Sequence, residues 1–326
     1  MYPQPRFILV KPAQLVNNGR IIRVDSLNPA AIYYYPGRAD IMRANLQRKP
    51  TASRLIHQLL AFLPGLLTLL FPVWFFGQDQ SSLLSKEEVR RFLLTAEVVK
   101  SEAIGKGITH PWRLTLSDGK LSHDASFQDV DVRAQEAGFA GGGRELNFAD
   151  SFHYNVAAYE LASLLELDDM VPIAVEREWK GKKGSLSWWV DDVKMDEEER
   201  LAKGIKPPDT GAWNRQMHKV RVFSQLIYDT DRNLQNILIS NDWKLWMIDF
   251  TRAFRTLRKL PEEKDLAKCE KTLFSKLLEL TKEAVSRTAG AHLTKWEIEA
   301  LMARRDLIAA YFQRLIAEKG ESAVLY

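Results

Sequence analysis

The sequence predicts an α+β protein of bilobal form, with a small antiparallel β-rich lobe over residues 79–193 and a helical lobe over residues 194–326. Three observations lead to this fold class. Apolar residues alternate between turn signals in the first lobe, which is typical of antiparallel strands. They recur every three or four residues in the second lobe, which is typical of amphipathic helices. The residues before position 79 show neither period and differ from the rest in charge.

The composition is that of an ordinary globular protein, but the charge is unevenly distributed. Hydrophobic residues make up 46% and charged residues 27% of the 326 residues. Residues 1–78, with nine Lys/Arg and two Asp/Glu, contribute +7, whereas the other 248, with 37 basic and 40 acidic residues, sum to −3. The folded part therefore gives no reason to expect nucleic-acid binding. The single cysteine, Cys269, excludes an internal disulfide, and the six scattered histidines do not predict a histidine metal centre.

The N-terminal leader divides into residues 1–54, which lack a regular period and are expected to be disordered, and a hydrophobic segment over residues 55–78. Leu55 to Phe76 are 22 residues without a charge, preceded by the basic residues Arg43, Arg48, Lys49 and Arg54. This is the plan of a secretory signal or a membrane anchor, so we expect an exported, bacterial-type protein in an extracytoplasmic, periplasmic location. Membrane contact through residues 55–76 would follow if the segment is not removed.

Other interpretations of the leader stay open. Pro64 and Pro72 would kink a permanent membrane span, and no A-x-A-like cleavage site follows Phe76. A buried core helix is the alternative. Met42 offers a shorter start with a conventional basic region, in which case residues 1–41 are an over-long start.

The first lobe begins with a helix and continues with strands. Ser85 to Glu88 form a capping box, and an apolar helical face follows at Val89, Phe92, Leu93 and Ala96. Gly105-Lys106-Gly107 then precedes two alternating apolar runs, one through Leu114 and one through Phe127, around a turn at Ser117–Lys120. This predicts two or three antiparallel strands. The glycine-rich stretch from Ala134 to Arg144 predicts a mobile loop.

A second helix and two more strands complete this lobe. Ser151 to Leu165 carry an apolar stripe, which predicts a core-facing helix. Val171–Arg177 and Ser185–Val190 are predicted strands joined by a Gly-Lys-Lys-Gly turn. The lobe is therefore expected to be a sheet of about five antiparallel strands with one inserted helix.

The second lobe is predicted to be mainly helical. The acidic run Met195–Arg200 indicates a solvated face, and Pro207-Pro208 interrupts the chain. A helix follows, because apolar residues recur at steps of four, three, three and four from Trp213 through Met217, Val220 and Phe223 to Ile227. Thr294 to Glu297 form a second capping box ahead of another apolar stripe.

The stretch from Val222 to Phe254 carries the residues best suited to chemistry. It predicts the end of a helix, a polar loop with Asp231, Arg232 and Asn236, and two strands, the second of which delivers Asp249. Asp231 and Asn236 are five residues apart, and Asn236 and Asp249 are thirteen apart. A carboxylate that orients a hydroxyl, together with hard oxygen ligands for magnesium, is what phosphoryl transfer needs. A polar hairpin loop without a catalytic role is the alternative.

These spacings resemble those of the protein-kinase superfamily, in the branch with a D-R-x-x-x-N catalytic loop. That branch includes secretory-pathway kinases, type II phosphatidylinositol kinases and bacterial persistence-toxin kinases. The resemblance also takes in the A-A-Y-E-L-A-S-L-L-E-L helix end and the I-D-F-T-R-A-F segment, and spans most of residues 100–316. It implies a kinase-like fold that binds ATP, or another nucleotide, and magnesium.

The resemblance also implies residue roles. Asp231 would be the catalytic base, Arg232 a structural or phosphate-facing partner, and Asn236 and Asp249 the magnesium ligands. The nucleotide would be bound by a glycine loop and by the start of the hinge, at Gly105, Lys106, Gly107, Trp189 and Val190. A plain glycine turn and core packing are the alternatives for these last five residues.

Two positions depart from the kinase pattern. The lysine that holds the α- and β-phosphates is replaced by Gln128, after Ala125-Ser126-Phe127, and its glutamate partner is replaced by Asn155. An ion pair would thus become an amide pair, which leaves no unpaired buried charge. Lys106 or Lys120 would be the substitute cation, and Glu160 the alternative partner one helical turn on.

The sequence therefore supports two main functions. The first is a kinase-like phosphotransferase that depends on ATP and magnesium and acts on a protein, a glycan or a small molecule. The second is a pseudokinase, a binding or regulatory module that keeps a nucleotide or metal site without efficient transfer. Nucleotidyl transfer in the same pocket is a third possibility. Losing one phosphate contact of this kind typically lowers the rate by ~10²–10³, so Gln128 and Asn155 weigh against a conventional kinase. The intact trio Asp231, Asn236 and Asp249 weighs against a site that binds no nucleotide.

Overall fold

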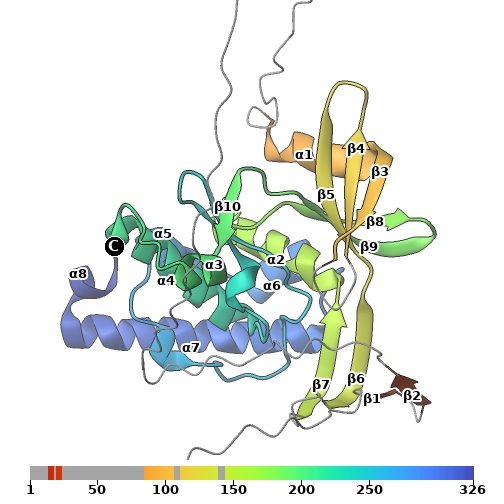
Figure 1. Cartoon of the computed structure of the whole chain (residues 1–326). Coiled ribbons are helices and arrows are strands. Elements are labelled where there is room, and N and C mark those ends of the chain that lie inside the picture. Colours follow the sequence, from red (N-terminus) through yellow and green to blue (C-terminus); the bar gives the residue numbers. More distant parts are fainter. Residues whose placement is uncertain (1–13, 18–19, 24–83, 106–110, 139–143) are drawn as a thin grey trace, which may run out of the picture.

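The computed structural model describes residues 14–17, 20–23, 84–105, 111–138 and 144–326 (Figure 1). It is an α+β fold in which an antiparallel sheet and a group of helices lie side by side. The hydrophobic segment at 55–78 and nearly all of the rest of the leader lie outside the described residues, as do Lys106 and Gly107. Within the described ranges, no helix has the length and apolar character needed to cross a membrane.

The main sheet is five-stranded and antiparallel, in the order β3-β4-β5-β9-β8. Its strands are β3 (Glu97–Ala103), β4 (Trp112–Ser117), β5 (Ser122–Gln128), β8 (Ala174–Trp179) and β9 (Lys182–Trp188). Helices α1 (Lys86–Thr95) and α2 (His153–Leu164) pack against β8 and β9. Both partners of the predicted capping box, Ser85 and Glu88, make their hydrogen bonds at the start of α1. The predicted sheet with an inserted helix is confirmed.

Strand β3 was not predicted, and it changes the position of the glycine loop. The Gly-Lys-Gly stretch was expected ahead of the first strand, whereas Gly105 follows β3 and begins the connection to β4. β3 escapes a sequence pattern because most of its side chains are exposed on both faces, so apolar and polar residues do not alternate.

A long hairpin of β6 (Asp131–Gly138) and β7 (Arg144–Ser151) is inserted between β5 and α2 and extends away from the main sheet (Figure 1). Strands β1 (Gln14–Asn17) and β2 (Arg20–Arg23) continue its edge, in the order β2-β1-β6-β7. The predicted loop over 134–144 is wrong for Ala134 to Gly138 and for Arg144. Cross-strand pairing with β7 supplies the backbone hydrogen bonds of these residues, and the pairing cannot be read from local composition.

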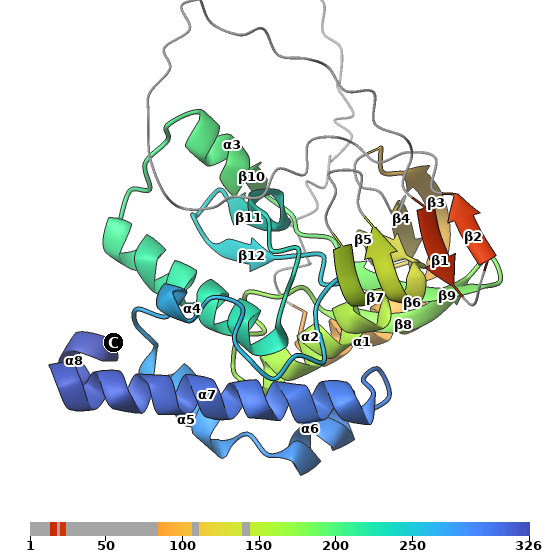
Figure 2. The ribbon, with the colours of Figure 1, turned by 90° about the horizontal axis from the view of Figure 1, so that it is seen from below.

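The helical half contains α4 (Thr210–Ile227), α5 (Lys271–Glu279), α6 (Lys282–Ala289), α7 (Lys295–Lys319) and α8 (Glu321–Val324), with a short 3-10 turn at Glu263–Asp265. The long helix α7 contacts α4, α5 and α6 (Figure 2). It begins at the predicted capping box of Thr294 and Glu297. Helix α4 buries the predicted stripe through Trp213, Val220, Phe223 and Ile227.

A small three-stranded sheet lies between the two halves. It is formed by β10 (Val193–Asp196), β11 (Ile237–Ser240) and β12 (Leu245–Met247), and α3 (Glu197–Ala202) follows β10. The prediction of a solvated acidic face here is wrong in part, because Met195 and Glu197 are buried. Arg200 neutralises Glu197 through two hydrogen bonds of 2.5 and 2.7 Å. Buried acidic residues of this kind require such a partner.

Candidate functional site

The loop between α4 and β11 is shaped by Asn233. Helix α4 ends at Ile227, and Tyr228 adopts a left-handed conformation with φ of 48° that turns the chain away. The Asn233 side-chain oxygen then accepts hydrogen bonds from the N–H groups of Gln235 and Asn236, at 2.9 and 3.1 Å, and so begins the turn Leu234–Asn236. Its amide nitrogen donates to Asp231 at 3.1 Å. One side chain therefore fixes both ends of the predicted Asp–Asn pair.

Arg232 holds the loop against the segment that carries Asp249. Its five N–H donors are all used: two hydrogen bonds go to the carboxylate of Asp229 and three go to the backbone oxygens of Asn236, Ile248 and Asp249. The Asp229 side chain is fully buried. Arg232 was expected to be a catalytic residue, either structural or phosphate-facing. The phosphate-facing alternative is corrected here, because every donor is committed to protein acceptors, and Arg232 is a positioning residue.

Asp249, two residues after the end of β12, has a strained backbone conformation. Its φ is 55°, which a non-glycine residue adopts at a cost and which is found preferentially at functional sites. The carboxylate accepts a hydrogen bond from the Thr251 hydroxyl at 3.1 Å and one from Gln128 Nε2 at 3.4 Å. The N–H of the next residue, Phe250, donates to Asn155 at 2.8 Å. Hydrogen bonds to the Asp249 side chain and from the Phe250 backbone thus hold this turn in place.

Gln128 and Asn155 meet as the sequence predicted. Asn155 Nδ2 donates to Gln128 Oε1 at 2.5 Å and to Ser185 Oγ at 2.9 Å. With the contact from Gln128 to Asp249, this gives a continuous series Ser185–Asn155–Gln128–Asp249, which we call the amide chain. Its members come from β9, α2, β5 and the segment after β12. Both amide side chains are buried, so their hydrogen bonds are not exchanged with water.

Neither Lys120 nor Glu160 takes the role expected of it, and Lys106, the other substitute cation, lies outside the described residues. Lys120 lies in the turn before β5, whereas Gln128 ends that strand, so the two are separated by roughly 20 Å along β5 at ~3.3 Å per residue. Glu160 forms an ion pair with Arg90 of α1 at 2.6 Å instead of approaching Gln128.

Asp150, which sequence reasoning missed, joins the same site. It lies near the end of β7, and its Oδ1 is buried without a hydrogen-bond partner among the described residues. Burial, together with the charges of Asp249 and Asp231, raises the pKa of Asp150 to about 6, although Thr251 and Arg252 oppose the shift. The only local signal was an acidic residue just before a predicted helix, which is a common pattern with no catalytic meaning.

The same electrostatics act on Asp231. Burial raises the pKa of its carboxyl group, and the neighbouring charge of Asp249 adds to the effect, while Asn233 and Arg252 lower it. The negative charge of Asp249 thus acts on both Asp150 and Asp231, and a divalent cation bound near Asp249 would relieve that repulsion.

The donors at this site fit a hard cation. The Asn236 amide nitrogen donates to the backbone oxygen of Asp231 at 3.0 Å, so the amide oxygen is the atom that remains to bind a metal among the contacts of the described residues. Asp249 and the unpartnered oxygen of Asp150 are further oxygen donors, the ligand type that Mg²⁺ and Mn²⁺ prefer.

The predicted nucleotide contacts are less defined. Gly105 is exposed at the end of β3, and Lys106 and Gly107 lie outside the described residues. The Trp189 N–H donates to the Asp124 backbone oxygen at 3.1 Å, and its ring lies under the Arg113 guanidinium at 4.4 Å. Val190 follows β9 and is partly buried. The role of these residues in holding a nucleotide stays a prediction.

A cavity of about 590 Å³ lies between the β6–β7 hairpin and the start of α7, and Ala149 is among its lining residues. None of the carboxylate residues Asp150, Asp231 and Asp249 is among the residues that line it. The cavity is therefore separate from the carboxylate cluster.

Comparison with known proteins shows the fold. No protein-family model matches the chain, and no curated protein matches its sequence. Its structure is similar to that of hydra Fam20 with sugar, at a TM-score of 0.56 and 14% identity, over 74% of this chain and 91% of that one. It is also similar to the Golgi casein kinase, at 0.51 and 13%, and to that kinase with Mn/ADP bound, at 0.50 and 13%, in both cases over 74% of this chain and 78% of that one. The chain thus has a protein-kinase-like fold.

Proposed function

We propose that this chain, which has a protein-kinase-like fold, is a phosphotransferase that uses ATP and a divalent metal ion. The observation that carries the proposal is the hydrogen-bond network around Asp231, Asn236 and Asp249. Arg232 binds the backbone oxygens of Asn236 and Asp249, and the Asn236 amide donates to the backbone oxygen of Asp231. Holding reacting groups in a fixed geometry supplies most of the catalysis in phosphoryl transfer. The Golgi casein kinase, which has a similar fold, was crystallised with Mn/ADP, and this supports nucleotide and metal as the ligands.

In this proposal Asp231 accepts the proton of the acceptor hydroxyl. Burial raises the pKa of Asp231 above that of an ordinary aspartate, which makes its carboxylate a better base. Asn236 and Asp249, with Asp150 beside them, would hold Mg²⁺, which when bound neutralises charge on the phosphates. Gln128 offers the phosphates a neutral amide donor in place of an ammonium group. Transfer is then expected to be slower than in an enzyme with a lysine at this position.

A pseudokinase remains the second candidate, and the amide chain is the observation that favours it. Gln128 and Asn155 form hydrogen bonds with each other and with the segment that carries Asp249, and these bonds do not require a bound nucleotide. A fold held in this way is compatible with nucleotide binding that does not lead to transfer.

A labelling experiment separates the two functions. The full chain is incubated with γ-labelled ATP and Mg²⁺, alone and with protein, glycan and small-molecule hydroxyl acceptors, next to Asp249→Ala and an Asp265→Ala control at an exposed position. Label that is transferred by the wild type and the control but not by Asp249→Ala supports the phosphotransferase. If Mg·ATP raises the unfolding temperature without transfer, the pseudokinase is supported instead. If it neither binds nor reacts, both proposals fail.

We also propose that the protein is exported or membrane-anchored, on the strength of the basic flank and the uncharged run over residues 55–76. Cell fractionation together with N-terminal sequencing tests this. Recovery of the chain in the cytosol with residues 55–76 intact would contradict it.

A further inference from the structure

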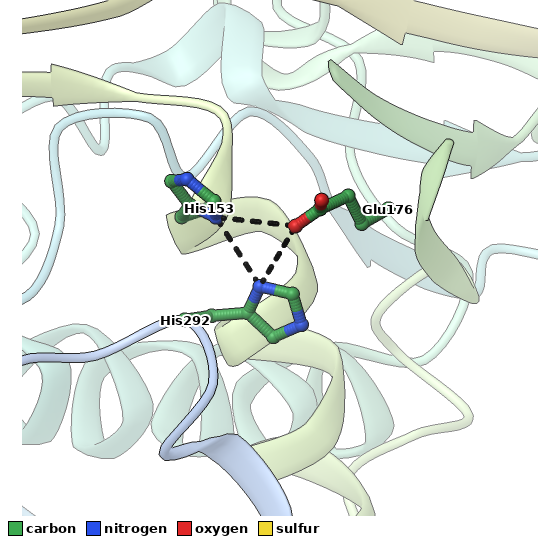
Figure 3. Close-up of side chains that lie close together, drawn as sticks. All are labelled: His153, Glu176 and His292. Atoms are coloured by element: carbon green, nitrogen blue, oxygen red, sulfur yellow. Dashed lines mark hydrogen bonds and ion pairs between the residues drawn. The ribbon is translucent and has the colours of Figure 1, made fainter. Parts of the chain in front are cut away.

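Two histidines and a glutamate meet at a point outside the carboxylate site. His153 is the first residue of α2, Glu176 lies on β8, and His292 lies in the loop between α6 and α7 (Figure 3). His153 and His292 are 139 residues apart in sequence. Their side chains point toward one another and toward the Glu176 carboxylate. The main sheet, its packed helix and the helical half each contribute one of the three groups.

The distances are those of ligands around a common centre. The Nδ1 atoms of the two histidines are 3.3 Å apart, and Glu176 Oε2 lies 3.6 Å from His153 Nδ1 and 3.7 Å from His292 Nδ1. Zn²⁺ binds histidine nitrogen and carboxylate oxygen at ~2.0–2.2 Å, so two ligands of a tetrahedral ion are separated by about 3.3–3.6 Å. The three observed separations match that spacing with little adjustment.

Pairwise hydrogen bonding explains this arrangement less well. Both distances from a histidine Nδ1 to Glu176 Oε2 exceed the range of a hydrogen bond. If the two Nδ1 atoms share a hydrogen bond with each other, neither histidine donates to Glu176 Oε2. The second oxygen of Glu176 faces Lys183 Nζ at 3.6 Å, which leaves Oε2 for the cluster. The side chains are between one seventh and one third exposed, so an ion can enter from solvent.

The chemistry of the donors indicates the class of metal. Two imidazoles and one carboxylate suit Zn²⁺ and the neighbouring divalent transition metals, whereas Mg²⁺ prefers oxygen ligands. A ligating imidazole must be neutral.

We propose that His153, Glu176 and His292 bind a divalent transition-metal ion, with Zn²⁺ as the expected species and water at the remaining position. The ion clamps the first turn of α2 to the α6–α7 loop. Because His153 is two residues before Asn155, the clamp also restrains the helix that carries the amide chain. This site is independent of the phosphotransferase proposal, since it shares no ligand with the carboxylate cluster.

Cobalt(II) is the probe for a direct test. The full chain is freed of metal, saturated with Mg²⁺ to occupy oxygen-ligand sites, and titrated with Co²⁺ while its visible d–d absorption and bound metal are measured. The wild type is expected to bind one equivalent of Co²⁺, and the bound Co²⁺ should show the strong visible absorption of a four- or five-coordinate ion. Zn²⁺ is expected to displace the bound Co²⁺. Because His292 lies in the loop between α6 and α7, the variant His292→Ala should fold. It is expected to weaken binding at least 100-fold, and Glu176→Gln at least tenfold.

His218→Ala, on α4 outside the cluster, is the matched control and should bind like the wild type. Hydrogen exchange gives a second measurement: Zn²⁺ should slow exchange at the start of α2 and in the α6–α7 loop of the wild type and leave His292→Ala unchanged. Absence of Co²⁺ binding by the wild type, or equal binding by His292→Ala, would overturn the proposal.

Discussion

Converting the amide chain into an ion pair is the most direct test of how this site is built. In the single variant Asn155→Glu, a carboxylate replaces a side chain that is only 5% exposed, and it faces the Gln128 oxygen without a cation. A buried charge without its partner costs about 3–5 kcal/mol. In the single variant Gln128→Lys, the ammonium faces the Asn155 amide nitrogen. The nearby Asp249 carboxylate compensates in part, so we expect a smaller loss of roughly 1–3 kcal/mol.

The double variant should recover part of this loss. Its ammonium lies between two carboxylates, at positions 155 and 249, and the extra length of the new side chains is accommodated by moving the ammonium toward Asp249. We therefore expect a coupling free energy of roughly 2–3 kcal/mol in favour of the double variant. Urea unfolding of the four proteins without nucleotide measures this coupling. A second cycle combines Gln128→Lys with Gln313→Glu, an exposed position on α7, and should be additive.

The same double variant should transfer phosphate faster. An ammonium beside the phosphates supplies a contact that typically contributes ~10²–10³ in rate, and label transfer from ATP measures the gain. Additive stabilities in the first cycle would refute the pairing of Gln128 with Asn155 in solution. A coupled pair with unchanged transfer would refute the view that position 128 faces the phosphates.

Three further predictions concern residues around the carboxylates. Arg232→Ala leaves the buried carboxylate of Asp229 without its partner and is expected to lower the free energy of unfolding by about 3–5 kcal/mol in urea unfolding. The control Arg258→Ala loses an exposed ion pair with Glu299 at 3.3 Å and should lower it by less than about 1 kcal/mol in the same experiment. Burial raises the pKa of Asp150 to about 6 from 3.8, so its contribution to the stability of the metal-free protein is present at pH 4 and lost as the pH rises through 6. The loss is at most about 3 kcal/mol. Urea unfolding at pH 4 and 7.5 measures it, and Asp150→Asn should abolish it. Gly184→Ala would place a Cβ 2.5 Å from the backbone oxygen of Gln128, so we expect a loss of about 1–3 kcal/mol of stability and weaker Mg·ATP binding.

Each of these has a result that contradicts it. Equal losses for the two arginine variants would show that Arg232 does not hold the loop. An unchanged pH dependence in Asp150→Asn would remove this carboxylate from the cluster. Wild-type stability of Gly184→Ala would mean that β9 can move away from Gln128 at little cost.

Local signals in the sequence determined most of the elements that carry the site. The two capping boxes, at Ser85 and Thr294, fix the starts of α1 and α7, because the partners of each box are three residues apart. The apolar stripe of α4 and the spacing from Asp231 to Asp249 lie within one short stretch, where periodicity and turn chemistry act directly. The pairing of Gln128 with Asn155 was accessible as well, because the changes at the two positions complement each other.

Tertiary structure decided what depends on segments that are far apart in sequence. Asp150 enters the carboxylate cluster because the β6–β7 hairpin pairs strands around a glycine-rich connection, and neither its register nor its direction is encoded locally. The role of Arg232 became clear once its acceptors on both sides of Asn236 were in place. His153 and His292 showed no spacing motif, since 139 residues separate them and only the packing of α2 against α6 brings them together with Glu176. Periodicity describes a face of one helix or strand, whereas a site built from three elements depends on how those faces pack.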